Sequence, residues 1–193
     1  MSRPANPELP NRILTAAEEI VAAEGHHSLN MRELAKKVGI TATTIYNHFK
    51  DKDNLLLQLE VRIAEKLNDR IRHIDPALDP AQYLYEFGVI YLDFAKENPR
   101  LYRLYMESEL CVDEHGYIIR TDKDYKQLYF PYYAARNTLE RHAGKYTPEV
   151  GATLGWVLLH GFASLMSSGR LQPAEGQTLE DLREQFFRFY ITL

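Results

Sequence analysis

The segment 31–52 brings together side chains that can form hydrogen bonds with phosphates and with the edges of bases. Tyr46 and His48 can donate to phosphate oxygens, and Lys52 adds a positive charge beside the free N–H groups of an expected helix start. Asn47 can pair with adenine through both polar atoms of its amide. Residue types of this kind, so close together, indicate recognition of nucleic acid.

The same segment has the small and apolar residues that a helix-turn-helix needs. Two short helices that cross steeply require a small residue where they touch and glycine in the tight turn, and Ala35 and Gly39 meet these needs. We expect Asn30 and Thr41 to cap the two helices, which leaves the polar face of 41–47 free to enter a major groove. The apolar positions that would hold the pair against a preceding helix are Leu34, Val38, Ile40 and Ile45.

Apolar residues recur at helical spacing along most of the chain, and period-two alternation is almost absent. The predicted fold is therefore all-α, with about nine helices whose limits are set by capping residues, glycines and prolines. The predicted helices span residues 11–24, 31–37, 41–47, 51–75, 80–97, 99–109, 122–144, 148–169 and 178–192.

The composition is that of an ordinary globular protein, with 45% hydrophobic and 26% charged residues. The single cysteine cannot form an intrachain disulfide, and the N-terminus lacks the apolar run of a signal peptide, so we expect a cytoplasmic protein. The net charge is −4, but residues 1–74 contain 11 basic and 10 acidic residues. This part of the chain is the better candidate for contact with a polyanion.

The helix-turn-helix belongs to a longer pattern. Residues 34–41 read LAKKVGIT, residues 44–49 read TIYNHF, and Lys52 and a leucine pair at 55–56 follow. Over about residues 11–60, this pattern resembles the signature of the tetracycline-repressor (TetR) family of transcriptional regulators.

The resemblance implies a three-part organisation. A helix-turn-helix DNA-binding domain would cover residues 1–50, a connecting helix four residues 51–75, and a helical ligand-binding and dimerisation domain residues 76–193. Matched by position and chemistry, several side chains would touch phosphates or base edges, and Thr43 or Ala42 could meet a thymine methyl group. The predicted DNA contacts are Arg32, Thr41, Ala42, Thr43, Thr44, Tyr46, Asn47, His48 and Lys52. Ile45 and Phe49 are expected in the core, and Thr41 also serves as a cap.

The resemblance further implies a homodimer that binds a palindromic operator in double-stranded DNA and releases it when a small, largely apolar effector binds. A transcriptional activator, or a ligand-independent regulator of the same fold, is the alternative. A helical adaptor that binds protein, or an enzyme acting on an apolar substrate, is a remote one. Because the sequence has no common catalytic or phosphate-binding motif, we predict no enzyme activity, and we predict no cofactor and no metal site.

Residues 76–193 hold 12 of the 13 tyrosines, many at helical spacing. Such stripes are usually core, but buried tyrosines also suit a pocket with apolar walls and polar groups. Residues 156–161 (WVLLHG) resemble the Trp-His-Gly motif of one class of TetR C-terminal domain, over roughly residues 80–192. The predicted effector contacts are Tyr91, Tyr102, Tyr105, Tyr125, Tyr129, Trp156 and His160. His160 could instead satisfy a neighbouring protein group.

The last two helices carry small and apolar residues that suit close helix packing. Family members usually pair through these helices, and the predicted dimer residues are Gly151, Gly155, Leu158, Leu182, Phe186 and Tyr190. Packing within one subunit is the competing interpretation. The stretch 150–169 has no charged residue, but its polar residues and glycines favour a helix buried within or between subunits. We therefore predict no membrane span.

Overall fold

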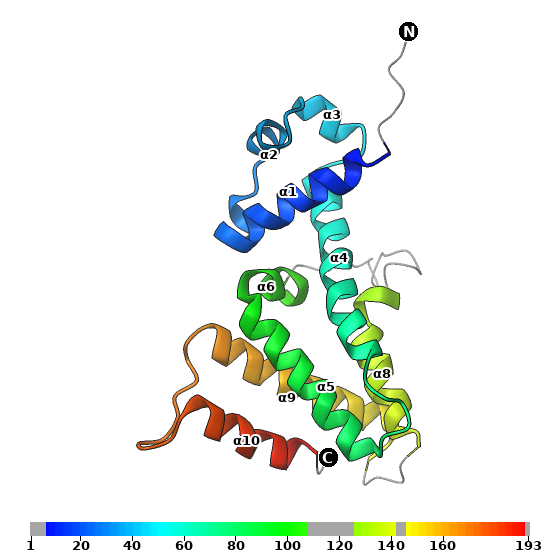
Figure 1. The fold of residues 1–193 in the computed structure, drawn as a ribbon, viewed down its shortest axis with the longest axis vertical. Coiled ribbons are helices and arrows are strands. Elements are labelled where there is room, and N and C mark those ends of the chain that lie inside the picture. Colours follow the sequence, from blue (N-terminus) through cyan, green and yellow to red (C-terminus); the bar gives the residue numbers. More distant parts are fainter. Residues whose placement is uncertain (1–6, 108–125, 142–145, 192–193) are drawn as a thin grey trace, which may run out of the picture. The chain divides into compact units, whose positions relative to one another are not determined.

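A computed structural model describes residues 7–107, 126–141 and 146–191 of the chain (Figure 1). These ranges contain helices and no strand, which confirms the all-α prediction. The helices are α1 (Leu9–Glu24), the 3₁₀ turn η1 (His26–Ser28), α2 (Met31–Val38), α3 (Ala42–Tyr46), α4 (Lys52–Arg72), α5 (Pro80–Glu97), α6 (Pro99–Glu107), α8 (Phe130–Leu139), α9 (Pro148–Ser167) and α10 (Leu179–Tyr190).

The chain divides into two compact units. The first comprises residues 1–63 and 100–118, and the second comprises residues 64–99 and 119–193. Helix α4 therefore contributes residues to both units. Helix α6 belongs almost entirely to the first unit, where the Arg100 guanidinium donates a hydrogen bond to the carbonyl of Ala22 (3.2 Å) near the end of α1. The domain boundary at residue 76 stays a prediction.

The first unit is built around α1, against which η1 and α2 pack. Ile13, Ala17 and Val21 recur at helical spacing on α1 and are fully buried. From α4, Arg62 forms an ion pair with Glu18 (3.2 Å) and a hydrogen bond with the hydroxyl of Thr15 (3.0 Å). Helix α1 thus holds the short helices and the start of α4 in one unit.

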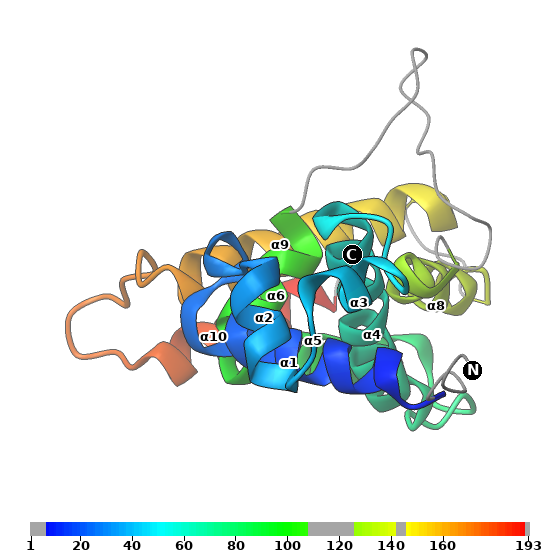
Figure 2. The same ribbon diagram turned by 90° about the horizontal axis from the view of Figure 1, so that it is seen from above.

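The second unit is a cluster in which α9 packs against α5 and α8, and α10 packs against α5 (Figure 2). Aromatic rings join the last two helices, with the centroids of Phe162 and Phe186 4.6 Å apart. Helix α10 begins with a capping box in which the side chains of Thr178 and Asp181 each bond to the other residue's backbone N–H. The hydrogen bonds from the backbone N–H and the hydroxyl of Thr178 lower the pKa of Asp181.

The predicted helix over 122–144 differs from the described structure. Residues 126–128 are helical, the helix is interrupted at Tyr129, and α8 begins only at Phe130. The reason is Pro131, which lacks a backbone N–H and fits a helix only in its first turn. The sequence prediction ran through this proline, and its ends lie outside the described residues.

Helix α9 is the one described helix that is long and apolar enough to cross a membrane, with a mean hydropathy of 1.4 over an 18-residue window. The core helix of a soluble protein passes the same test. Here Leu159 and Ala163 are fully buried within the chain, and Phe162 contacts α10. Packing in the second unit therefore explains one face of α9, and 33% of the apolar window is buried in this way.

Two glycines in helices of the second unit provide a matched test of this packing. A Cβ at Gly88 would lie 2.5 Å from Cε1 of Phe187, whose ring also packs against Tyr85, whereas a Cβ at Gly161 would meet nothing within 4 Å. We predict that Gly88→Ala lowers the free energy of unfolding by about 1–3 kcal/mol through overpacking. Gly161→Ala should leave it unchanged or raise it by up to about 1 kcal/mol. Denaturant unfolding checks both, and equal effects would contradict the packing described.

Candidate nucleic-acid interface

The turn between α2 and α3 is set by local hydrogen bonds. The Asn30 side chain caps α2 by accepting from the backbone N–H of Arg32 (2.9 Å). Gly39 ends the helix with φ +77° and ψ +36°, a left-handed conformation that glycine adopts without strain. The N–H of Ile40 then donates to the carbonyl of Ala35 (3.0 Å). These bonds direct the chain sharply into α3, as the sequence predicted.

Apolar residues hold the two short helices in this arrangement. Leu34 and Ile45 are fully buried, and Ala35 and Phe49 are 3% and 4% exposed. The small side chain of Ala35 lies where the two helices meet, since α2 and α3 are in direct contact. The expected core roles of Ile45 and Phe49 are confirmed, and the polar face of α3 is left outward.

The outward face carries the side chains that the sequence singled out. Thr43, Asn47 and His48 are exposed, and Tyr46 is 50% exposed. The structure thus brings the predicted base-reading and phosphate-binding side chains to one short element and its C-terminal end.

Threonines at the start of α3 have a structural role. The hydroxyl of Thr41 accepts from the backbone N–H of Thr44 (3.2 Å) and lies 2.9 Å from the Thr44 hydroxyl. This is the capping arrangement expected for Thr41. Both hydroxyls are therefore engaged within the chain, and Ala42 is partly exposed beside them. DNA contacts by these three residues stay predictions.

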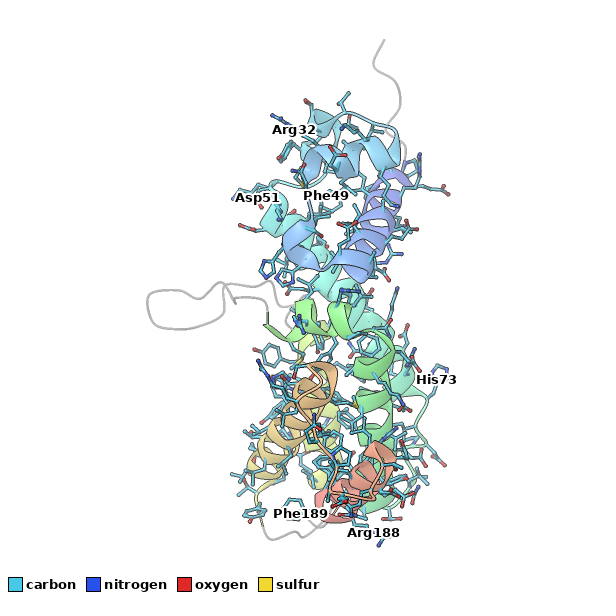
Figure 3. The ribbon with its side chains drawn as sticks, turned by 90° about the vertical axis from the view of Figure 1, so that its left-hand side faces the viewer. Arg32, Phe49, Asp51, His73, Arg188 and Phe189 are labelled. Atoms are coloured by element: carbon cyan, nitrogen blue, oxygen red, sulfur yellow. The ribbon has the colours of Figure 1, made fainter. Side chains whose placement is uncertain are left out.

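Only some of the cations near the motif are unpaired. On α2, Lys36 pairs with Glu33 (2.8 Å) and Lys37 pairs with Glu19 (3.0 Å). Arg32, labelled in Figure 3, is exposed at the N-terminal end of α2. It makes no ion pair with the described residues. Arg32 is the α2 cation that is available to a ligand.

The start of α4 is capped by Asp51, as the sequence predicts. The carboxylate of Asp51 accepts from the backbone N–H of Asn54 (2.8 Å), so the helix end beside Lys52 already holds an anionic cap. Lys52 is partly exposed, and its neighbour Lys50 is exposed and makes no ion pair with any described residue. Sequence reasoning passed over Lys50, although its place between the motif and α4 was a usable signal.

The predicted effector residues fall into separate places. Tyr129 and Trp156 meet edge to face, with ring centroids 5.9 Å apart, and His160 lies half-buried one turn further along α9. Tyr91 is 1% exposed on α5. Tyr102 and Tyr105 lie on α6, which belongs to the first unit, and Tyr125 lies outside the described residues.

The second unit contains a small apolar hollow of about 10 Å³, room for about one water molecule. Its lining residues are Leu84, Ala135, Leu139, Gly151, Ala152, Gly155 and Tyr190. Burial, with the nearby Tyr91, raises the pKa of the Tyr190 phenol well above its usual range. None of the predicted effector residues lines this hollow, so the effector site remains a prediction.

The dimer prediction is changed for the two glycines and Tyr190. A Cβ at Gly151 would lie 2.9 Å from Leu139 Cδ1, and one at Gly155 would lie 3.3 Å from the Tyr190 ring. These glycines admit side chains of the same chain, in agreement with the competing interpretation of packing within one subunit. The sequence shows that a close approach is allowed, but it does not show which partner makes the approach. Leu158, Leu182 and Phe186 are half-buried.

A different apolar face was missed. On α9 and α10, six large apolar residues are 36–62% exposed: Val150, Leu154, Val157, Leu165, Leu179 and Phe189. The α9 members follow helical spacing, so they form a stripe on one side of that helix. Their spacing in an uncharged stretch could have identified them.

The fold and the helix-turn-helix define a class of bacterial regulatory proteins. The profile of "Bacterial regulatory proteins, tetR family" matches residues 13–59, and that of "Tetracyclin repressor-like, C-terminal domain" matches residues 84–190. The chain therefore belongs to the TetR family, whose members are helix-turn-helix transcriptional regulators and not enzymes. The Trp-His-Gly subclass stays a prediction.

Individual relatives agree with this assignment. The chain is 41% identical over 61 residues to an uncharacterised regulator of Haemophilus influenzae, which covers 32% of this chain and 33% of the relative. It is 28% identical over 107 residues to the transcriptional activator FasR of Mycolicibacterium smegmatis, covering 55% and 49%. These matches span about a third to a half of the curated relatives.

The fold is also found in solved structures. The fatty acid degradation regulator FadR of Bacillus halodurans superposes with a TM-score of 0.64 at 16% identity, over 98% of this chain and 97% of that one. At this identity, the likeness shows the shared fold alone.

The unpaired lysines give a test of the interface. If Lys50 and Lys52 each neutralise one phosphate, Lys50→Gln and Lys52→Gln should each reduce the slope of log K against log salt by about 0.9. The exposed Lys96 on α5 provides the matched control, Lys96→Gln, which should leave the slope unchanged. Fluorescence anisotropy with duplex DNA at several salt concentrations measures the slopes. Unchanged slopes for both Lys50→Gln and Lys52→Gln would exclude these lysines from the interface.

Proposed function

We propose that this chain is a cytoplasmic homodimeric repressor that binds a palindromic operator and releases it when a small, largely apolar effector binds. The observation that carries the proposal is the outward polar face of α3, with Tyr46, Asn47 and His48 exposed beside a buried helix-turn-helix core. In this position, Tyr46 and His48 contact phosphates, and Asn47, Thr43 and Arg32 read bases.

The exposed apolar stripe of α9 supports the dimer. Val157 is 62% exposed, and Phe189 on α10 is 57% exposed, the two highest values among the large apolar side chains of the described residues. Exposed apolar groups that continue along one helix face indicate a protein interface. A two-fold axis through this face brings the stripe against its own copy, and the resulting dimer carries two copies of α3, one for each half-site of a palindrome.

The aromatic character of the second unit supports an apolar effector. The Tyr129 and Trp156 rings meet, and Tyr132 lies 6.1 Å from Trp156 between ring centroids. Large aromatic side chains with polar groups at their edges are typical of small-molecule sites. Release of the operator to one-hundredth of its original affinity requires about 2.7 kcal/mol of coupling between the two sites.

Activation is the second candidate, favoured by the similarity to the transcriptional activator FasR, which matches this chain over 107 residues. The two functions share the DNA face and differ in what binding does to RNA polymerase. Transcription in vitro from a template that carries the selected operator separates them, because a repressor lowers transcript yield and an activator raises it.

Operator recognition tests the central proposal. Duplexes selected from a random pool by the purified protein should contain an inverted repeat. We predict that Asn47→Ala weakens binding by about 5- to 150-fold and relaxes base preference at one position in each half-site. Tyr46→Phe should weaken binding about tenfold or more without changing the preference, because it removes a phosphate contact. If neither variant changes affinity or preference, α3 is not the recognition helix.

The dimer face has its own test. Val157→Glu places two like charges across the proposed two-fold axis and should shift the protein from dimer to monomer at micromolar concentration, measured by sedimentation. Tyr133→Glu is the control, because Tyr133 is similarly accessible (38% exposed) but lies on α8 in the same unit. A Val157→Glu protein that stays dimeric would place the interface elsewhere.

A further inference from the structure

Asn68 lies on α4 within the second unit, and its side chain is completely buried. The amide Nδ2 donates to the backbone carbonyl of Gln127 (2.8 Å) and lies 3.3 Å from Gln127 Oε1. The amide oxygen Oδ1 has no hydrogen-bond partner. Among the described residues, it is the one buried side-chain polar atom without a partner.

The orientation of this amide is fixed by its surroundings. Exchanging the amide nitrogen and oxygen would turn Oδ1 toward two acceptors of Gln127 and lose both hydrogen bonds. Oδ1 therefore points away from Gln127, on a helix where the neighbouring Leu67 and Ile71 are buried. It presents a buried acceptor without a partner.

Leaving such an acceptor unpaired destabilises the free protein, because the group loses its hydrogen bonds to water and gains none in exchange. Apolar residues of similar shape would remove this cost, so a buried amide here is consistent with a ligand that completes it. A bound water molecule is the competing explanation, and a buried water needs two to four polar partners. The test below separates the two.

We propose that Oδ1 of Asn68 accepts a hydrogen bond from the effector, which therefore carries a hydroxyl or N–H donor on a largely apolar body. This inference rests on the proposed function, in which the effector binds the second unit. A ligand with an ionised carboxylate as its only polar group has no donor and is disfavoured. Because α4 continues from Asn68 into residues 52–63 of the first unit, the bond acts on a helix shared by both units.

Isomeric probes isolate the donor. 1-Decanol and 1-methoxynonane have the same atoms, as have 4-pentylphenol and 4-butylanisole, but only the first of each pair donates a hydrogen bond. Binding without DNA is followed by the fluorescence of Trp156, the single tryptophan of the chain. We expect at least one donor isomer to bind roughly tenfold more tightly than its ether.

The variant Asn68→Leu should reduce this ratio to about one. Asn137→Leu, at an exposed position on α8, is the matched control and should keep the full ratio. The wild-type comparison needs no variant, so it remains decisive if Asn68→Leu fails to fold. Equal binding of the isomers, binding of neither donor isomer, or an unchanged ratio in Asn68→Leu would overturn the inference.

A crystal structure with the preferred donor should show its oxygen within hydrogen-bond distance of Oδ1. If a water molecule is instead bound to Oδ1 in that complex, water and not the effector is the hydrogen-bond partner of Asn68, and the inference is overturned. Because the titrations contain no DNA, they are independent of the regulator proposal. A chain that binds no operator but keeps the isomer ratio would disprove the proposed function and leave the Asn68 site intact.

Discussion

The apolar stripe of α4 is the constraint on which both units depend. Leu55, Leu59 and Ile63 are completely buried in the first unit, and Leu67 and Ile71 are buried on the same helix in the second. A 21-residue helix with this pattern cannot be repacked in one unit without affecting the residues that it supplies to the other. Arg62 adds a polar attachment, since it bonds to both Glu18 and Thr15 of α1. Any signal from the second unit that alters the packing of α4 therefore has a covalent route to the helices that present Tyr46 and Asn47.

The sequence was most informative where local rules decide the structure. Gly39 ends α2 because a left-handed residue is required there, and Asn30 and Thr41 cap their helices as their side chains suggest. Helical periodicity located the other elements, but it did not register Pro131, around which the long predicted helix divides. Periodicity measures an average over many residues, whereas one missing N–H decides where a helix begins.

Packing partners could not be predicted in the same way. Gly151 and Gly155 indicated a close approach, which the structure contains, but the approaching side chains are Leu139 and Tyr190 of the same chain. Small residues on a helix indicate how closely another element can approach, but they do not indicate which element it is. The same limit applies to the tyrosines, because a stripe on a helix does not reveal which stripes converge, as Tyr129 and Trp156 do. Asn68 could not be singled out at all, since an unpaired amide oxygen is a property of three-dimensional surroundings.

The weak positive charge of the first unit means that the proposed DNA contact depends on dimer formation. Glu33 and Glu19 lie beside Lys36 and Lys37, and although such exposed ion pairs are weak, their carboxylates reduce the positive potential that phosphates would meet. A half-site is then held by a few contacts, and a single subunit gains little affinity from counterion release. In the proposed dimer, the second subunit would bind the second half-site at a high effective concentration, which would multiply the weak contacts. Sparse charge would also keep nonspecific binding low, so recognition would depend on base contacts and on the spacing between subunits. Under this proposal, a change in that spacing, carried by α4, would suffice to release the operator without altering any contact residue.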